Sequence, residues 1–464
     1  MKNVLIVSDW DFAYIWKKVI PILKEEESVN ISVLVVGRVY LPFFNKLTLD
    51  KVYLLQDYLE SFDDIESISN DEISQLERKY GDPNLWRCVL ADRNWVKDDY
   101  NTSMKKISKC YSFFEKVICE TKPDIVLTNA YASMPHHVMY KVAEYNKIPC
   151  VRPLAMRLDN YFTACYSRGE FLELPKSTSD ESDEIVRQKM LSIKEKLPKP
   201  FYEKIHVENR SDYARHIRRL LNYTCKRHFS GEYKNDHTKP TIFKKIRDEA
   251  TFYCRKFRQK NLGVSANLDS DFVFFPLHLQ PEASTMQLAP YWLDQKFIIE
   301  TIAKSLPTGV LLYVKEHPTM IGRRESRYYR ELKSLPNVVV IKTNENTGNI
   351  LKNALAVFTI TGTVGIESLL MGKPTFILGN PYYRECSEVV RLNCSPIENW
   401  SEVIKENLVK KIDENNVHHY FSKIISNSEK MFFNEPLLSK ELVLNELNIN
   451  RIAKFFGKEV RCIK

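Results

Sequence analysis

The stretch LLYVKEHP at Leu311–Pro318 decides how the chain is organised. It is an apolar run of strand length that ends abruptly in charged residues, an imidazole and a proline. The same pattern recurs in ALAVFTI at Ala354–Ile360. This run is followed by TGTVGIES at Thr361–Ser368, which predicts a turn and the start of a helix. Ligands of parallel α/β sheets bind beyond the carboxyl ends of the strands. These two strand ends therefore predict a pocket for a phosphate-bearing donor.

Strands alternate with helices on both sides of this unit. Before and after it we expect strands at Val4–Ser8, Ile31–Gly37, Phe272–His278, Val338–Ile341 and Thr375–Leu378. Helical spacing of apolar residues fills the intervals, as in Gln295–Ser305, while Pro21 predicts a kink or an early stop in the first helix. This alternation predicts an α/β protein with parallel, doubly wound sheets.

The length of 464 residues exceeds what one core of usual size organises, so more than one domain is expected. We expect an N-terminal α/β domain, a polar and basic helical insertion, a second α/β domain and a C-terminal helical segment packing across the domains, at residues 1–168, 169–262, 263–400 and 401–464. Within the insertion, Ser177–Glu184 is expected to be a surface loop.

The chain shows no stretch of the roughly 18 apolar residues that would span a bilayer. Its first residues indicate a β-strand rather than a signal peptide, so we expect a cytoplasmic protein. The ten cysteines are scattered without a C-x-x-C pair, and they predict buried free thiols rather than disulfides or a zinc site.

The net charge of +9 is concentrated in one block. Residues 213–260 hold 14 Lys and Arg against 4 acidic residues, so the remainder of the chain is near neutral. Basic residues fall at helical spacing in Arg215–Arg219 and Lys244–Arg258. Such a block suits anionic lipid, nucleic acid or an acidic glycan. Because no RNA-binding motif accompanies it, we expect no nucleic-acid partner. A solvated helical face, or a surface for an anionic membrane or a charged glycan, is favoured.

The residues of the predicted donor pocket suit an anion. An imidazole such as His317 donates hydrogen bonds to phosphoryl oxygens. Hydroxyls and backbone N–H groups around Thr361, Gly362 and Thr363, at a helix start, favour the same ligand. Lys315 would add charge. The alternatives are a His that caps locally, an ordinary Thr N-cap and an exposed Lys.

Further polar residues follow the same strand ends. Glu367, one turn into the helix, suits the two hydroxyls of a ribose, and Gln280 and Glu282 suit the sugar of a donor. Glu282 is also a candidate catalytic carboxylate. The alternatives are an exposed helical Glu and a polar surface loop. No residues have metal-ligand spacing, so we expect no metal and no cofactor.

Acidic residues also follow the first strand of the chain. Asp9 or Asp11 suits a general base that takes a proton from an acceptor hydroxyl, and helix capping is the alternative for at least one of them. The pair His136 and His137 is interpreted as structural, because no other His or Cys lies at ligand spacing.

These motifs together resemble the capsule polysaccharide biosynthesis family, which includes bacterial Kdo transferases. The resemblance rests on FPLHLQPE at Phe275–Glu282, KEHP at Lys315–Pro318 and TGTVGIES at Thr361–Ser368, followed by Gly372–Pro374. It is strong from about residue 271 to 383, weaker over the first 160 residues and absent from the basic block. The His-Pro and Thr motifs also resemble those of bacterial sialyltransferases, although their acidic pair followed by Gly has no clear counterpart.

The resemblance implies a GT-B glycosyltransferase with two Rossmann-like domains facing a cleft. It implies that His317, Thr361 and Thr363 bind the donor phosphate, that Glu367 binds the ribose, and that the donor is a CMP-activated ulosonic acid such as Kdo. The acceptor would be a glycan or glycolipid. The alternatives are a GT-B transferase for UDP- or GDP-sugars, a sugar-nucleotide epimerase, or a non-catalytic partner in capsule assembly or export.

Overall fold

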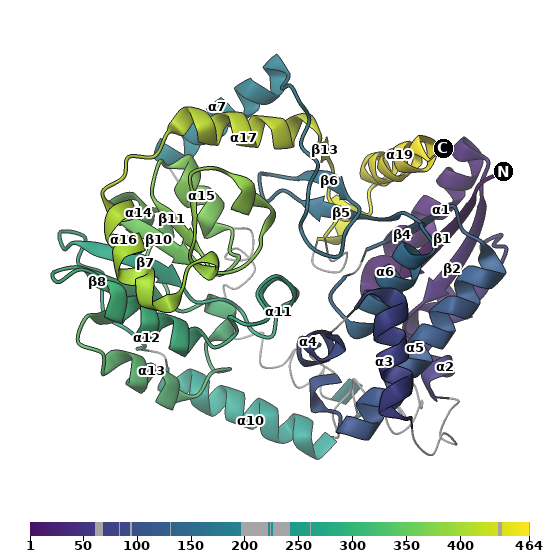
Figure 1. The fold of residues 1–464 in the computed structure, drawn as a ribbon, viewed down its shortest axis with the longest axis horizontal. Coiled ribbons are helices and arrows are strands. Elements are labelled where there is room, and N and C mark those ends of the chain that lie inside the picture. Colours follow the sequence, from purple (N-terminus) through teal and green to yellow (C-terminus); the bar gives the residue numbers. More distant parts are fainter. Residues whose placement is uncertain are drawn as a thin grey trace. The chain divides into compact units, whose positions relative to one another are not determined.

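The computed structural model describes residues 1–60, 68–82, 84–92, 95–129, 131–195, 221–222, 224–225, 242–259, 261–434 and 439–463. The chain divides into two compact units. The first unit comprises Met1–Ser177 together with Lys423–Lys464, and the second unit comprises Thr178–Ser422 (Figure 1). The divisions expected after residues 168, 262 and 400 stay predictions.

The first unit is built on a seven-stranded sheet with the order β13-β6-β5-β4-β1-β2-β3. Strands β3, β2, β1, β4 and β5 are parallel, which is the Rossmann-like order, while β6 and β13 are added antiparallel. The strands are β1 Asn3–Ser8, β2 Asn30–Val35, β3 Val52–Leu54, β4 Ile125–Thr128, β5 Cys150–Ala155, β6 Tyr161–Cys165 and β13 Glu429–Lys430.

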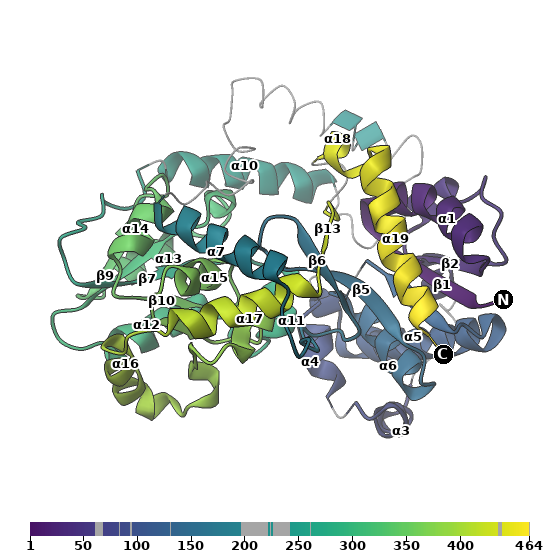
Figure 2. The same cartoon turned by 90° about the horizontal axis from the view of Figure 1, so that it is seen from above.

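Helices cover both faces of this sheet, because the parallel strands are apolar on both sides. One face is covered by α1 (Ala13–Glu27) and the C-terminal helix α19 (Glu446–Cys462), which lie side by side in Figures 1 and 2. The other face is covered by α2 Leu55–Glu60, α3 Asn70–Tyr80, α4 Leu85–Leu90, α5 Tyr100–Thr121 and α6 Met134–Tyr145.

The early stop considered at Pro21 was wrong, because α1 continues past Pro21 to Glu27, while the kink stays a prediction. Burial of the helix face that carries Trp16 and Leu23 offsets the backbone hydrogen bond that proline removes. The ring of Trp16 packs 4.8 Å from that of Phe456 on α19, centroid to centroid. The C-terminal helix therefore contributes directly to the core of the first unit.

The second unit holds a six-stranded parallel sheet with the order β12-β11-β10-β7-β8-β9. Its strands are β7 Phe272–Pro276, β8 Leu311–Lys315, β9 Val338–Ile341, β10 Ala356–Thr359, β11 Thr375–Ile377 and β12 Val389–Arg391. The predicted alternation of strands and helices is confirmed here, so both units are Rossmann-like and the protein is α/β.

Helices α7 (Asp180–Glu195) and α10 (Ile242–Arg258) of the second unit come from the predicted insertion. The other helices of this unit are α11 Ala283–Leu288, α12 Gln295–Ser305, α13 Ser326–Lys333, α14 Thr347–Asn353, α15 Val364–Leu370, α16 Trp400–Leu408 and α17 Glu414–Ser426. A further short helix, α18 Lys440–Val443, precedes α19. Helix α7 lies beside α17 in both views, and His418 Nε2 is 2.9 Å from the carbonyl oxygen of Asp183.

One local expectation was wrong, and a second is confirmed for the part that the structure describes. The loop expected at Ser177–Glu184 is instead the first turn of α7 from Asp180 onward, where acidic residues favour the positive end of the helix dipole. The helix expected at Lys244–Arg258 is confirmed as α10, whereas Arg215–Arg219 lies outside the described residues.

All ten cysteines are free, as expected, but only half of them are buried. The expectation of burial was wrong for Cys119, Cys225, Cys254, Cys394 and Cys462, which lie at exposed positions. Within the described ranges, the helices are too short or too polar to cross a membrane.

Candidate functional site

The candidate site of the second unit is organised by His278, two residues after the end of β7. This strand lies between β8 and β10, so its end can connect the two motifs that follow those strands. His278 is 8% exposed, and its Nε2 accepts a hydrogen bond from the N–H of Ile360 at 3.0 Å. An N–H group only donates, so Nε2 carries no proton and a neutral ring is protonated on Nδ1. His278 thus ties the end of β7 to the end of β10.

The backbone of His278 is held by two further side chains. The amide of Gln295 accepts from His278 N–H at 2.7 Å and donates to its carbonyl at 3.1 Å. Arg324 Nη2 donates to the same carbonyl at 2.6 Å. Burial of this network makes each partner necessary, because an unpaired buried polar group costs about 1–3 kcal/mol.

Arg324 also connects this network to β8 through Glu316. Its Nε lies 2.9 Å from Glu316 Oε2, as an ion pair rather than an aligned hydrogen bond. Glu316 is 1% exposed and accepts from the hydroxyl of Tyr329 at 2.6 Å. Burial raises the pKa of Glu316, and Arg324 and Tyr329 oppose that shift. The ends of β7, β8 and β10 therefore form one connected edge.

His317 follows Glu316 and presents its ring at this edge. Nδ1 accepts from the N–H of Thr319 at 3.3 Å and lies 2.7 Å from its hydroxyl oxygen. Because Nδ1 accepts, the neutral ring is protonated on Nε2. The local-cap alternative is therefore confirmed for Nδ1, and the expectation of a ligand-binding His stays a prediction that concerns Nε2. Nδ1 caps the short 3-10 helix Pro318–Met320, and Nε2–H is the donor suited to a phosphoryl oxygen.

The Thr361–Thr363 segment follows β10 and opens α15. Thr361 is buried, whereas Thr363 is exposed and makes no side-chain capping bond to the helix. Gly362 is required by close packing rather than by a positive φ. A Cβ there would lie 2.8 Å from Thr359 Oγ1 and 2.9 Å from His278 Cε1. The glycine therefore lets this segment lie against His278.

Substitution of Gly362 by alanine is expected to destabilise the protein by about 1–3 kcal/mol, because the new Cβ overlaps Thr359 and His278. Chemical denaturation measures this loss. The matched control is Gly37→Ala, where φ is −114° and a Cβ would meet the ring of Tyr40 at 3.6 Å, an ordinary contact distance. An unchanged stability of the Gly362 variant would contradict the packing described here.

The other predicted residues of the donor pocket follow the same strand ends, and they differ in burial and in hydrogen-bond partners. Lys315 is buried, and its ammonium donates to the carbonyl of Glu345 at 2.8 Å and to Thr347 Oγ1 at 2.6 Å. Gln280 Nε2 donates to the carbonyl of Leu293 at 2.8 Å. Glu282 is the N-cap residue of α11, and Glu367 lies half-buried on α15.

The predicted acidic residues Asp9 and Asp11 belong to the first unit, at the carboxyl end of β1. Asp9 Oδ1 accepts from the N–H of Trp10 at 2.9 Å, so Asp9 does act as a cap. Asp11 Oδ1 accepts from the hydroxyl of Tyr40 at 3.2 Å. Their catalytic role stays a prediction.

His136 is a residue of this region that the sequence analysis interpreted as structural only. Its Nε2 lies 3.7 Å from Asp9 Oδ2, and its Nδ1 contacts the hydroxyl of Ser133. The ring is 1% exposed, and this burial lowers its pKa to about 3, which keeps the ring neutral. The neighbouring His137 pairs with buried Asp82, in line with a structural role. The sequence did offer one signal for a position near Asp9, because His136 follows the end of a predicted strand, as Asp9 does.

Protonation of His136 is expected to contribute to acid destabilisation. Its folded-state pKa is depressed, so the unfolded state binds the proton more tightly and stability falls as the pH drops below about 6.5. Between pH 7 and pH 5 the loss should reach about 2 kcal/mol. His136→Gln should remove that part of the slope in denaturation curves measured across this range. The wild-type protein, measured over the same pH range, is the reference.

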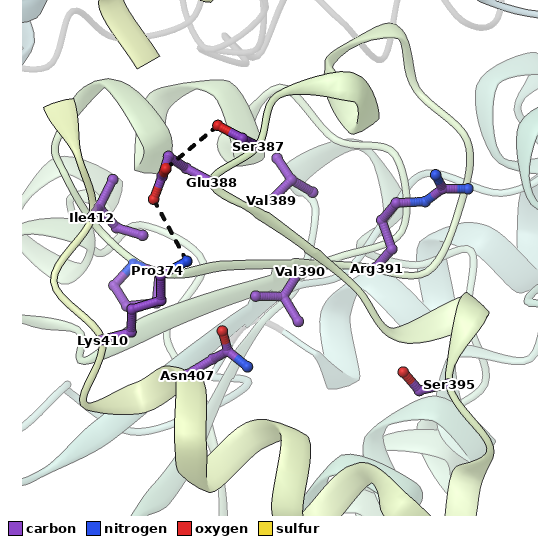
Figure 3. Close-up of a pocket in the computed structure, with 10 residues that line it drawn as sticks. All are labelled: Pro374, Ser387, Glu388, Val389, Val390, Arg391, Ser395, Asn407, Lys410 and Ile412. Atoms are coloured by element: carbon purple, nitrogen blue, oxygen red, sulfur yellow. Dashed lines mark hydrogen bonds and ion pairs between the residues drawn. The ribbon is translucent and has the colours of Figure 1, made fainter. Parts of the chain in front are cut away.

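A cavity of about 250 Å³ lies along the edge strand β12, away from these motifs (Figure 3). Glu388 and Lys410 meet on one side of it, with 3.9 Å between their charged atoms, while Arg391 extends on the other side. None of the predicted site residues lines this cavity. Across the described ranges, no three His, Cys, Asp or Glu side chains gather as metal ligands.

Comparison with known proteins places the second unit in a family. The family model described as "Capsule polysaccharide biosynthesis protein" matches residues 179–412, half of the chain. The chain belongs to the capsule polysaccharide biosynthesis protein family. The matched region nearly coincides with the second unit, and it contains every predicted donor-pocket residue.

Curated relatives align over shorter regions. Protein FixF of Sinorhizobium fredii is 31% identical over 143 residues, which cover 29% of this chain and 33% of FixF. The capsule polysaccharide modification protein LipA of Neisseria meningitidis serogroup B is 31% identical over 72 residues, covering 16% of this chain and 10% of LipA. The chain thus spans a third or less of the length of these relatives.

Solved structures resemble the chain at low sequence identity. KpsC of Thermosulfurimonas dismutans, titled a beta Kdo 2,7 transferase, shows a TM-score of 0.33 and 10% identity, covering 75% of this chain and 89% of that one. S. aureus MnaA bound to UDP shows a TM-score of 0.29 and 13% identity, covering 100% and 98%. Since both TM-scores lie below 0.5, the fold assignment rests on the sheet topology described above.

Proposed function

We propose that this protein is a GT-B glycosyltransferase of capsular polysaccharide assembly that transfers an ulosonic acid such as Kdo from a CMP-sugar. The observation that carries the proposal is the connected edge of the second unit. His317 follows the buried parallel strand β8, and its Nδ1 accepts the hydrogen bond from Thr319 N–H, so that a neutral ring carries its proton on Nε2. Family membership supplies the capsular context.

In this proposal the second unit binds the donor. His317 Nε2–H donates to a phosphoryl oxygen, and the hydroxyls of Thr361 and Thr363 donate to the same group. Glu367 accepts from the ribose hydroxyls, while Gln280 contacts the sugar and Lys315 contributes positive charge. These donors stabilise the phosphate that leaves with CMP, which is the role fixed dipoles perform best in a preorganised site.

The acceptor reaction needs a base for the attacking hydroxyl. Asp9 is the proposed base, because its Oδ2 lies beside the neutral ring of His136 while Oδ1 is engaged by Trp10 N–H. Asp11 and Glu282 are the alternative carboxylates. The hydroxyl oxygen of a glycan or glycolipid acceptor forms the new bond to the anomeric carbon, its proton passes to the base, and the bond from that carbon to the phosphate oxygen breaks.

The test is a thermal-shift panel with CMP, CDP, UMP, UDP and GDP. A nucleotide at about 100 times its Kd stabilises the folded state by about 2.7 kcal/mol. Selective stabilisation by CMP is the expected result. Stabilisation by UDP or GDP instead would overturn the donor class, and a transferase or epimerase for those sugars would replace it. No response to any nucleotide would overturn the donor site and favour a non-catalytic assembly partner.

A further inference from the structure

Helix α10 is an amphipathic helix that is fixed to the second unit along one side. Arg255 Nη1 donates to the carbonyl of Arg323 at 3.2 Å, and Arg255 also pairs with Glu325 at 3.0 Å. Gln259, directly after the helix, accepts from the N–H of Gly322 at 2.7 Å. A Cβ on Gly322 would lie 2.8 Å from the carbonyl of Phe252, so the helix packs closely against this segment.

The other side of α10 exposes apolar side chains. Phe243 is 87% exposed, Phe257 is 80% exposed and Ile246 is 46% exposed. With the exposed Ala250 and Cys254 they recur at spacings of three and four residues, which places all five on one face. The face runs for about 21 Å along the helix axis, at about 1.5 Å per residue. We call these five residues the apolar stripe.

Basic residues border the apolar stripe. Lys244, Arg247 and Arg258 are exposed, and each follows a stripe residue by one position, so all three lie along the same border of the stripe. The helix as a whole carries six Lys and Arg against Asp248 and Glu249, a net charge of +4. An exposed apolar face bordered by Lys and Arg is the composition of helices that lie in the interface of anionic membranes.

We propose that α10 docks the protein on an anionic phospholipid membrane, with the apolar stripe inserted among the acyl chains and the flanking cations at the headgroup phosphates. The helix lies parallel to the membrane plane. The mixture of aliphatic and aromatic residues fits a lipid surface better than a platform for stacking bases, which needs aromatic rings. The inference does not depend on the donor, so it can fail or hold independently of the proposed transferase activity.

The test is co-sedimentation of the full chain with vesicles of phosphatidylcholine alone and with about one third phosphatidylglycerol. Wild-type protein should bind only the anionic vesicles, and added salt should weaken the binding. Phe243→Ser/Phe257→Ser should reduce partitioning at least about tenfold. Lys244→Gln/Arg247→Gln/Arg258→Gln should reduce it by about fivefold per charge, or about 100-fold together.

The control variant is Tyr291→Ser, which removes an aromatic ring that is 74% exposed elsewhere on the second unit and should leave binding unchanged. Unchanged unfolding temperatures in all variants establish that the fold is retained. Equal binding to neutral and anionic vesicles would overturn the proposal, as would variants that bind like the wild type. A dimer that the double Phe substitution dissociates would assign the apolar stripe to a second copy of the chain and overturn the proposal. Binding to single-stranded RNA without binding to vesicles would assign it to RNA and overturn the proposal as well.

Discussion

Replacement of His317 by alanine is expected to lower kcat/KM for sugar transfer by about 10²–10³-fold, the usual effect of removing one donor from a preorganised oxyanion site. The reason is that Nε2–H would donate to a phosphoryl oxygen on which charge develops as CMP leaves. The same variant should lose the stabilisation by CMP. Release of CMP from a CMP-sugar measures the first effect, and thermal unfolding with CMP measures the second.

Two further substitutions of His317 distinguish the role of Nδ1 as an acceptor from the role of Nε2 as a donor. His317→Asn keeps a group near Nδ1 that accepts from Thr319 N–H, but it removes the donor at Nε2. This variant should fold like the wild type and remain inactive. His317→Gln extends an amide N–H toward the position of Nε2 and should retain part of the activity. Full activity of the Asn variant would remove His317 from the donor site and leave it as a helix cap.

The elements of the second unit could be predicted from the sequence to a large extent. Strand β9 and helix α12 have the bounds that were predicted from the sequence, because the apolar residues of the strand pack on both faces of the sheet and those of the helix pack on one. The motifs after β8 and β10 were placed at one edge for a topological reason, since the carboxyl ends of parallel strands meet there. The position of this edge could therefore be predicted without knowledge of side-chain contacts.

The contacts within that edge could not be predicted in the same way. His278, Arg324 and Glu316 meet through pairings between residues far apart in the sequence, such as the 2.6 Å bond from Arg324 to the carbonyl of His278. Sequence spacing carries no information about such pairs. Likewise, the proximity of His136 to Asp9 depends on the parallel pairing of β1 and β4, which local patterns do not specify.

The proline in α1 shows the same distinction. Local propensity predicts an interruption at Pro21, but the helix continues because its buried face and the C-terminal helix α19 pack together. The packing partner lies more than 400 residues away in the sequence, as shown by the contact between the rings of Trp16 and Phe456, whose centroids are 4.8 Å apart. Such a tertiary contact overrides a local signal that is correct on average.

The largest loss of stability is expected from Arg324→Met, because it leaves the carboxylate of Glu316 buried without its cation. Removing one partner of a buried ion pair typically costs about 3–5 kcal/mol. It also removes the bond that Arg324 makes to His278. Chemical denaturation measures the loss. Arg327→Met is the control, since Arg327 is 77% exposed in its pair with Glu331 and such pairs contribute about 0–1 kcal/mol.

The pH dependence of Arg324→Met distinguishes an unpaired charge from a mere loss of packing. Burial already raises the pKa of Glu316, and loss of Arg324 should raise it further. A carboxyl group with a raised folded-state pKa holds its proton more tightly in the native state, so stability falls as the pH rises through that pKa. The deficit of the variant should therefore be smaller near pH 5 than near pH 8. Adding Glu316→Gln should recover much of the loss at pH 8, because the buried charge is then absent. A deficit that is independent of pH and unaffected by Glu316→Gln would instead assign the role of Arg324 to its packing against Tyr328.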